Sequence, residues 1–301
     1  MAIRLSENFR ALFYAPFYAA HAIGAYAAEG VEVELVASPD PARTAAALGD
    51  GSIDVMWGGP LRVLLTHAQD PRADSVCFCD VVARDPFFII GREPRPGFRL
   101  ADLQGLRFAS VSEVPTPWLC LQDDLRRAGL DPAALKRVDG PSMADNAEAV
   151  RTGALDAAQL FQPYAEALIR SGGGHVWYAA ADRGRTAYTT LVTRRPLLAS
   201  RRDELLRMVR GMARTLRWIA DTQGVDVARA VRGHFPDVAE DLFAAAIDRY
   251  RALQLYATDP VLRQEGFDRL QAAMLSGGAL PRAIGFDTCV DNSLAEIAVA
   301  S

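Results

Sequence analysis

The sequence predicts an α/β protein with two similar lobes, each built on a mostly parallel sheet that is flanked by helices. Short apolar runs rich in Val and Ile alternate with Ala-rich segments of helical period, which is the βαβ pattern of parallel sheets. The same pattern restarts near residue 106. A Gly-x-x-Asp motif also recurs before a buried strand and a proline-opened helix, as GSIDVMWGGP from Gly51 and GALDAAQLFQP from Gly153.

The first half contains four predicted strands that are separated by three predicted helices. Proline is favoured in the first turn of a helix and glycine just beyond its last turn, and Pro41, Pro60 and Gly30 stand at such positions. The predicted strands are Ile3–Ser6, Val31–Ala37, Ile53–Met56 and Ser75–Ala83. The predicted helices span residues 16–29, 41–49 and 60–68.

The second half repeats this order, and the last third of the chain is mostly helical. Strands are predicted over Leu106–Val111 and Ala154–Leu160, and helices over Pro117–Ala128, Ser142–Arg151 and Pro163–Ser171. Beyond about residue 200, apolar residues recur on one helical face of Glu204–Thr222. Further helices are predicted over residues 225–233, 238–255 and 259–276.

The lobes are predicted to be joined by ordered strands, because no low-complexity linker interrupts the chain. Residues 1–84 plus 190–301 form the first predicted lobe and residues 85–189 form the second. The two crossings, which are the predicted hinge strands, are placed near Asp80–Pro86 and Tyr188–Arg194.

Composition excludes several classes of function. The chain has 301 residues and a formal net charge of −4, which argues against a nucleic-acid partner. No apolar run approaches the ~20 residues that span a bilayer, and MAIRLSENF lacks the basic start and apolar core of a signal peptide. The chain as given is therefore expected to be soluble and leaderless. It is either a cytosolic protein or a mature domain without its leader.

Metal, disulfide and cofactor chemistry is not indicated either. The four cysteines, Cys77, Cys79, Cys120 and Cys289, form no CxxC motif, and the chain has only four histidines. Cys77 and Cys79 alternate in a predicted strand and are expected to share a face. The sequence contains no GxGxxG or Walker loop, and no spacing argues for a catalytic Ser-His-Asp or Cys-His set. We therefore predict no catalytic residues, no metal and no cofactor.

Candidate ligand contacts follow the predicted strands, since ligands bind beyond the carboxyl ends of strands in doubly wound sheets. The segment after the first strand supplies Asn8, Phe13, Tyr14 and Phe17. Its aromatic density fits either core packing or the aromatic wall of a cleft. Both interpretations stay open from the sequence.

The turn Trp57-Gly58-Gly59 follows the third strand and precedes a helix that Pro60 opens. Glycine lets a ligand approach the backbone, and a helix start offers free N–H groups to an anion or a polar group. The alternative is a tight turn around a buried Trp57.

The second half offers polar groups at corresponding positions. Ser112 and Thr116 lie between a strand and a helix, where they act either as helix caps or as cleft residues. The next strand ends in amide and aromatic side chains, which suit a neutral or zwitterionic ring. The candidates here are Ser112, Thr116, Gln159, Phe161 and Gln162, with Tyr188 at the return crossing.

Several of these stretches resemble the substrate-binding proteins of ABC importers for nitrate, sulfonates and thiamine-pyrimidine precursors. The resemblance covers nearly the whole chain, through LFYAPFYAAHAIGAYAAEGVEVELV, GDGSIDVMWGGPLRVLL, LQDDLRRAGLDP, VRTGALDAAQLFQPYAEALI and GFDTCVDNSLAEIA. One departure is Gln162, which stands where the family commonly has Glu.

The resemblance implies a two-lobed type II periplasmic-binding-protein fold that closes on a small ligand about its hinge strands. Trp57 would then lie on the cleft floor and stack on a flat ligand. A ring-bearing, thiamine-pyrimidine-like molecule suits the aromatic wall, whereas nitrate would suit Arg10 and Arg62. The implied partners are a small-molecule ligand and, if the protein is exported, an ABC permease and ATPase. The family's role implies the periplasm, and a native start at Met1 implies the cytoplasm.

A leaderless cytosolic enzyme on the same fold is the alternative. Fungal thiamine-pyrimidine synthases resemble this family, but they use a lysine-bound pyridoxal phosphate, and the only lysine here is Lys136, far from the segment around Arg43. Cys77-Phe78-Cys79 is a fragment of their iron motif in the wrong half. Menaquinone-pathway enzymes also use this fold in the cytoplasm, so the enzyme alternative stays open. A ligand sensor ranks last, because no signalling domain is visible.

Overall fold

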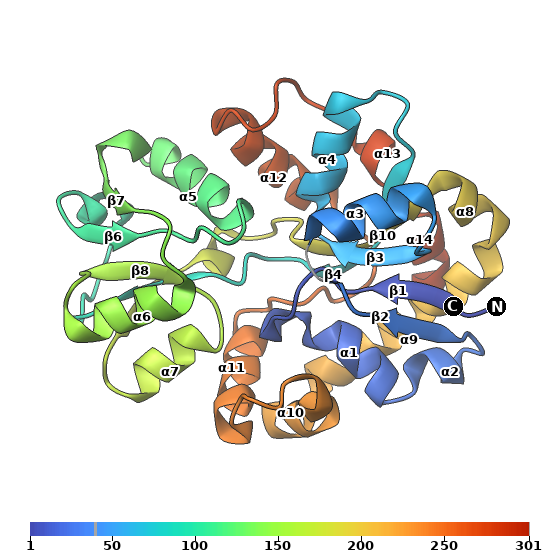
Figure 1. Ribbon diagram of the computed structural model, residues 1–301, viewed down its shortest axis with the longest axis horizontal. Helices are drawn as coiled ribbons and strands as arrows, with labels where there is room; N and C mark the ends of the chain where they lie inside the picture. The colour runs from blue at the N-terminus through green and yellow to red at the C-terminus, as the bar shows by residue number, and fades with distance from the viewer. Residues whose placement is uncertain (39–40, 301) are drawn as a thin grey trace.

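Two five-stranded sheets form the two lobes of the protein (Figure 1). The computed structural model describes residues 1–38 and 41–300. The first sheet has the order β2-β1-β3-β10-β4. Its strands are β1 Ile3–Ser6, β2 Val33–Val36, β3 Val55–Gly58, β4 Ser75–Val82 and β10 Thr189–Arg194. The second sheet has the order β7-β6-β8-β5-β9. Its strands are β5 Phe88–Gly91, β6 Arg107–Ala109, β7 Lys136–Val138, β8 Ala157–Leu160 and β9 His175–Ala179.

Both sheets follow one plan. In each, three neighbouring strands pair in parallel, and the strand that arrives from the other lobe, β10 or β5, runs antiparallel between two neighbours. The predicted fold class, with two lobes and mostly parallel sheets flanked by helices, is confirmed. The sheet membership of the strands supports the predicted lobes 1–84 plus 190–301 and 85–189, whose bounds stay a prediction.

Helices cover both faces of each sheet, and the C-terminal helices all pack on the first lobe (Figure 1). The second lobe has α5 Thr116–Arg127, α6 Met143–Thr152 and α7 Tyr164–Arg170. The first has α1 Ala15–Ala22, α2 Ala25–Ala28, α3 Pro41–Asp50, α4 Pro60–Gln69, α8 Arg195–Ser200, α9 Arg202–Asp221, α10 Gly224–Val231, α11 Glu240–Ala252, α12 Gln264–Ser276, α13 Phe286–Cys289 and α14 Ser293–Ala300. None of the helices in residues 1–38 and 41–300 combines the length and the apolar composition of a membrane span.

Two predicted elements differ from the structure for identifiable reasons. The helix predicted over residues 16–29 is broken, because Gly24 adopts a left-handed φ of 66° between α1 and α2. The third strand lies two residues later than predicted, over Val55–Gly58, since Trp57 and Gly58 pair with Leu191 and Thr190 of β10. That antiparallel partner comes from a distant part of the sequence.

Cys77 and Cys79 do not share a face, contrary to the prediction. Cys77 pairs with Val192 and Cys79 with the adjacent Leu191, so β4 contains one extra residue, Phe78. Such a bulge reverses the alternation of side chains along a strand. Cys77 accordingly packs in one apolar cluster of the first lobe, and Cys79 packs in another.

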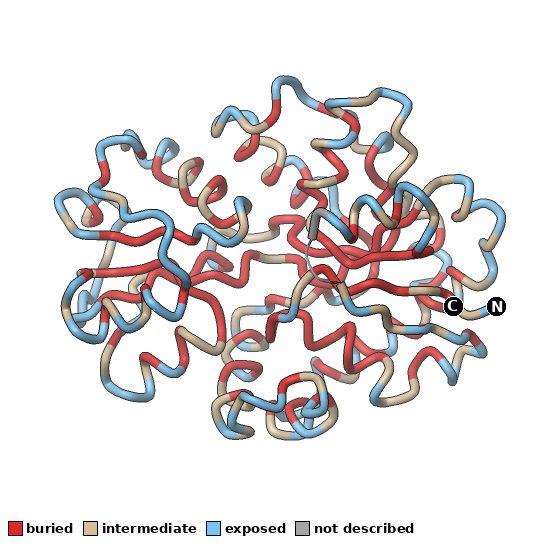
Figure 2. The backbone as a smooth tube through the Cα atoms, in the orientation of Figure 1, coloured by how far each residue is buried: buried red, intermediate tan, exposed pale blue. Residues whose placement is uncertain are grey.

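Both crossings between the lobes are buried along most of their length (Figure 2). The outgoing segment, residues 83–87, leaves β4 for β5, and the return segment, residues 184–188, leads into β10. The two segments lie side by side, because the amide of Thr186 donates to the carbonyl of Ala83 at 2.9 Å.

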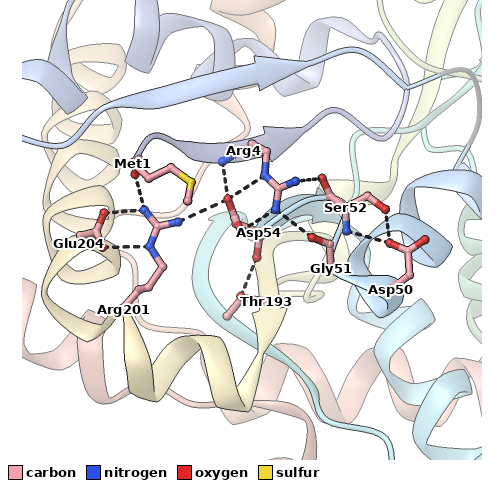
Figure 3. Close-up of polar contacts among 9 residues, drawn as sticks. All are labelled: Met1, Arg4, Asp50, Gly51, Ser52, Asp54, Thr193, Arg201 and Glu204. Carbon is pink, nitrogen blue, oxygen red and sulfur yellow. Dashed lines mark hydrogen bonds and ion pairs between the residues drawn. The ribbon is translucent and has the colours of Figure 1, made fainter.

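The repeated Gly-x-x-Asp motif forms an arginine clamp at the amino ends of the strands, away from the crossings. In the first lobe, Asp54 accepts hydrogen bonds from the Arg4 amide at 2.9 Å and from its guanidinium at 3.1 and 3.2 Å (Figure 3). The Arg4 guanidinium also donates to the Gly51 carbonyl at 2.8 Å. Arg201, which precedes α9 and pairs with Glu204, reaches Asp54 at 3.4 Å.

The second lobe repeats the hydrogen bonds that Arg4 makes to Asp54 and Gly51. Asp156 accepts from the Arg107 amide at 2.8 Å and from its guanidinium at 2.7 and 3.2 Å, and Arg107 donates to the Gly153 carbonyl at 3.0 Å. The prediction of two related halves therefore has a structural basis. The motif joins neighbouring strands of each sheet.

Replacing Asp54 should lower the stability of the protein by an amount that depends on pH. Burial raises the pKa of Asp54, but the hydrogen bonds and charge of Arg4 outweigh it and hold that pKa below its usual range. The stabilisation is therefore complete above the unfolded-state pKa and is lost as pH falls through the folded-state pKa. We expect Asp54→Asn to lower the free energy of unfolding by about 1–3 kcal/mol at pH 7, measured by urea denaturation.

The difference between Asp54→Asn and the parent should shrink as pH falls below 4, and a constant difference would contradict the assignment. The control is Asp226→Asn, which removes an exposed pair with Arg229 and should cost less than about 0.5 kcal/mol.

Candidate functional site

A cleft of ≈130 Å³ lies between the lobes, beyond the carboxyl ends of the central strands. Both lobes and the return crossing supply its walls. The lining residues are Asn8, Phe9, Phe13, Tyr14, Gly59, Leu61, Arg62 and Leu65 from the first lobe, Val114, Pro115 and Thr116 from the second, and Tyr188 from the crossing.

One wall of the cleft is aromatic. Phe9 packs against Phe13 and Tyr14 with ring centroids 6.0 and 5.2 Å apart, and Phe13 meets Tyr188 edge-on at 6.0 Å. Phe13, Tyr14 and Tyr188 are nearly fully buried, so neighbouring rings hold this wall rigid. It offers apolar contact to a flat ligand at little cost in side-chain entropy.

The polar groups of the cleft gather around the Tyr14 hydroxyl. Asn8 Nδ2 donates to Tyr14 Oη at 3.4 Å. Burial raises the pKa of Tyr14 to about 12, although hydrogen bonds to Asn8 and Thr189 and the charge of Arg62 oppose the shift. The hydroxyl therefore stays protonated at neutral pH and remains available as a donor or an acceptor.

Arg62 is the one charged residue among the described lining residues. In the part of the chain that the structure describes, no carboxylate pairs with its guanidinium, whereas most other arginines have an acidic neighbour. The cleft therefore carries an uncompensated positive charge, which favours an anionic or electron-rich group on the ligand.

Two helices begin at the cleft without side-chain caps. Gly59 precedes α4 and Pro115 precedes α5, and neither N-cap residue supplies a capping side chain. Apart from the Arg62 amide, which donates to the Gly59 carbonyl at 3.0 Å, first-turn amides are thus left for a ligand or solvent. Thr116 is the first residue of α5 rather than its cap, and Ser112 donates to the Pro141 carbonyl at 3.2 Å. Capping, one of the two roles weighed for Ser112 and Thr116, is therefore wrong for both.

Six of the predicted site residues line the cleft, namely Asn8, Phe13, Tyr14, Gly59, Thr116 and Tyr188. The prediction that Trp57 stacks on a ligand is wrong. Its indole is fully buried and is already stacked on Phe17, with centroids 4.7 Å apart and planes 9° apart. Phe17, Trp57 and Gly58 therefore form the core beneath the aromatic wall, because β3 extends through Gly58 into the sheet.

The remaining candidates support the cleft from behind, and none is among its described lining residues. Gln159 Nε2 donates to the Pro117 carbonyl at 2.9 Å, which holds the start of α5. Gln162 Oε1 accepts from the Glu166 amide at 2.8 Å in the first turn of α7. Phe161 meets Phe13 edge-on at 5.4 Å, so the aromatic core continues from one lobe into the other.

Sequence reasoning missed Leu61 and Leu65 as lining residues. They are spaced i, i+4 and share one face of α4. Because this pair stands at a helix start directly after a strand, the sequence could have identified both residues as candidates for the cleft. Only the tertiary structure shows that this face turns to the cleft.

A larger hollow of ≈650 Å³ lies where α9 and α11 end. Its rim carries exposed side chains such as Arg217, Asp221 and Gln254, and it receives no strand end. The smaller cleft is therefore the better candidate, because strand ends, a helix start and a free cation converge on it. Among the described residues, no group of three or more His, Cys, Asp and Glu could hold a metal ion.

A buried acid lies beside the crossing. Asp80 on β4 pairs with Thr190 of β10, and within the described chain its Oδ1 atom has no hydrogen-bond partner. Burial raises the pKa of Asp80 to about 7, although the Arg185 charge and the Val81 amide lower it. The carboxyl is therefore partly protonated at neutral pH.

The fold and the cleft define a two-lobed protein of the type II periplasmic-binding-protein class, as the resemblance implied. The model of the NMT1-like family matches residues 9–231, and the chain belongs to this family. The putative binding protein YtlA of Bacillus subtilis (strain 168) is 24% identical over 296 residues, which cover 98% of this chain and 89% of that protein.

Solved structures share the fold at lower identity. The periplasmic aliphatic sulphonate binding protein SsuA from Escherichia coli is 20% identical, with a TM-score of 0.76 over 94% of each chain. The desulfurization enzyme DSZB is 16% identical, with a TM-score of 0.71 over 99% of each chain. The fold therefore occurs in binding proteins and in an enzyme, so the function of this chain has to be inferred from the residues of its cleft.

Trp57→Ala should act on stability, since the indole belongs to the core. We expect the free energy of unfolding to fall by about 3–5 kcal/mol in urea denaturation. Trp177→Ala, on a partly exposed ring of the second lobe, is the control and should cost less. A variant of Trp57 that keeps its stability but loses ligand binding would restore the stacking role.

Asp80→Asn should stabilise the protein at neutral and higher pH. A folded-state pKa near 7 lies above the unfolded value, so the stability contributed by the protonated carboxyl is complete below pH ~4 and is lost as pH rises to about 7. The gain of Asp80→Asn, measured as a shift in Tm, should therefore grow between pH 4 and 7 and then level off. A gain that does not change with pH would contradict a raised pKa.

Proposed function

We propose that this chain is a solute-binding protein that captures a small, polar, single-ring molecule between its lobes. The size and lining of the cleft carry the proposal. An apolar cavity of about 150 Å³ holds one benzene ring, and the cleft measures ≈130 Å³. Its aromatic wall suits a flat ring, as in a thiamine-pyrimidine precursor.

The polar side of the cleft further narrows the ligand class. Asn8, Tyr14 and Thr116 offer hydrogen bonds, and Arg62 adds a positive charge without a carboxylate to balance it. A ring with a carboxylate, sulfonate or other electron-rich substituent facing Arg62 matches this arrangement. A bare pyrimidine would use the amide and hydroxyl groups only.

We propose that the protein delivers its ligand to an ABC importer. Closure of two lobes around a solute produces a form that an ABC permease and its ATPase can distinguish from the open form. The type II fold and membership of the NMT1-like family support this role. We therefore propose that the working protein is periplasmic.

The chemistry of the cleft favours binding over catalysis. Its described lining residues include no cysteine, histidine or carboxylate. The four cysteines are buried, and burial raises the pKa of Cys77 and Cys120 to about 12 and that of Cys289 to about 11. Thiols of this kind are poor nucleophiles.

A thermal-shift screen followed by calorimetry tests the proposal. The panel contains thiamine-pyrimidine precursors, single-ring carboxylates and sulfonates, aliphatic sulfonates and nitrate. A ligand at 100 times its Kd stabilises the folded state by about 2.7 kcal/mol, which a melting curve resolves. One responding class, recovered unchanged by mass spectrometry, supports a binding protein. Turnover of that compound would establish the enzyme instead.

Arg62→Gln and Tyr14→Phe should distinguish how much the charge of Arg62 and the hydroxyl of Tyr14 each contribute to ligand binding. For an anionic ring, we expect Arg62→Gln to weaken binding roughly 30-fold, or about 2 kcal/mol, because it removes a charge-assisted contact. Tyr14→Phe should cost roughly 5-fold, the value of one neutral hydrogen bond. Arg282→Gln on the exposed surface is the control. Equal ligand affinities of Arg62→Gln and the control would show that Arg62 does not contact the ligand.

A further inference from the structure

The outgoing crossing is fixed to the first lobe up to Arg84. The amide of Asp80 donates to the Pro260 carbonyl at 2.8 Å. The amides of Ala83 and Arg84 both donate to the Leu255 carbonyl, at 3.0 and 3.2 Å. These acceptors lie in the segment between α11 and α12, so the backbone of this part of the crossing is fixed to the first lobe. The Arg84 guanidinium donates to Gln254 of the same segment at 3.0 Å and also reaches the Ala181 carbonyl of the second lobe at 3.4 Å.

The next residue is fixed to the second lobe by a buried ion cluster. Arg183, in the short helix η4 Ala180–Arg183, donates to Asp85 Oδ2 at 2.5 Å and to Asp124 Oδ2 of α5 at 2.9 Å. The side chains of Arg183, Asp85 and Asp124 are 4%, 0% and 11% exposed. Tyr178 of β9 adds a hydrogen bond to Asp124 at 3.0 Å. One guanidinium thus joins the crossing, α5 and η4.

The return crossing also passes from hydrogen bonds with the second lobe to hydrogen bonds with the first lobe within a few residues. Gly184 follows Arg183 and adopts φ 95° and ψ −162°, a conformation that is essentially restricted to glycine. The amides of Thr186 and Ala187 then donate to the carbonyls of Ala83 and Gly266 at 2.9 Å each. The chain has therefore returned to the first lobe by Thr186.

The lobes also touch on both flanks of the crossings, and the two contacts differ (Figure 1). On the α7–α11 flank, the amide of Gln162 donates to Tyr250 Oη at 3.1 Å, and Arg249 pairs with the buried Glu166 at 2.6 Å. On the α5–α12 flank, Ser276 Oγ donates to Asp123 at 3.0 Å and accepts from the Arg126 guanidinium at 3.4 Å. Leu119 and Cys120 of α5 also pack in one apolar cluster with Leu270 and Met274 of α12, so apolar packing adds to the polar contacts on this flank.

We propose that Arg183 is a positioning residue that makes α5 and the second-lobe ends of both crossings one rigid body. Bending is then confined to the Arg84–Asp85 link and to Gly184-Arg185. This inference rests on the proposed function in one respect: α5 supplies Thr116 to the cleft, so its placement sets how the second lobe meets a ligand.

Spin-label distances in the ligand-free protein test the clamp, so a failed ligand screen leaves the result unaffected. The four native cysteines are buried, which leaves introduced thiols as the labelling sites. One pair, Ala128→Cys with Val176→Cys, reports on α5 against β9 within the second lobe. The other pair, Ala128→Cys with Gln69→Cys, spans the cleft. All three positions are exposed.

Arg183→Lys keeps the charge but cannot bridge two carboxylates with a fork of donors. We expect the distance distribution within the second lobe to roughly double in width. Arg107→Lys, which alters the clamp at the far end of the same lobe, is the matched control and should leave it unchanged. A folded Arg183→Lys protein with the control's narrow distribution overturns the proposal. If that variant does not fold, Asp124→Asn replaces it and is judged by the same criterion.

Gly184→Ala tests the second pivot. We expect it to shift the distribution across the cleft while the distance within the second lobe stays as in the parent. Gly172→Ala, which also has a positive φ, of 70°, but lies away from the crossings, is the control and should change neither. An unchanged distribution across the cleft in Gly184→Ala overturns the assignment of the pivot.

Discussion

The insertion of β10 between β3 and β4 is the interaction on which the rest of the structure depends. This strand returns from the second lobe and pairs antiparallel with two strands that the first 82 residues supply. It extends β3 through Trp57 and Gly58, which buries the indole and leaves Gly59 at the cleft. It also sets Tyr188, the residue before β10, against Phe13. The sheet, the crossing and the cleft wall are therefore one unit.

Aromatic packing connects the lobes beneath the cleft. Trp57 and Phe17 lie under the first lobe's wall, and Phe13 carries the contact across to Phe161 and Tyr188. A close-packed interior of this kind resists continuous deformation and instead favours a few discrete arrangements. A cleft with a rigid floor and walls that move as bodies suits the capture of one small ligand better than a flexible surface would.

Much of the fold could be predicted from the sequence, and less of the candidate site. The βα order, the Gly-x-x-Asp repeat and the helix ends depend on local periodicity and on glycine and proline, which act within a few residues. The segments that reach the cleft were also predictable, since strand ends bear ligands. The sequence, however, also favoured Trp57, Gln159 and Gln162, whereas the cleft is lined in these parts of the two lobes by Gly59, Leu61 and Leu65 and by residues 114–116.

The sequence by itself determined two lobes of one plan, each with a Gly-x-x-Asp motif, and an aromatic segment after the first strand. Only the tertiary structure decided which rings face the ligand, which acid lies buried at the crossing, and that Cys77 and Cys79 point to opposite faces. The physical reason is the range of the interactions. Periodicity and turns are set by neighbours in sequence, whereas burial, register and bulges are set by partner strands from distant parts of the chain.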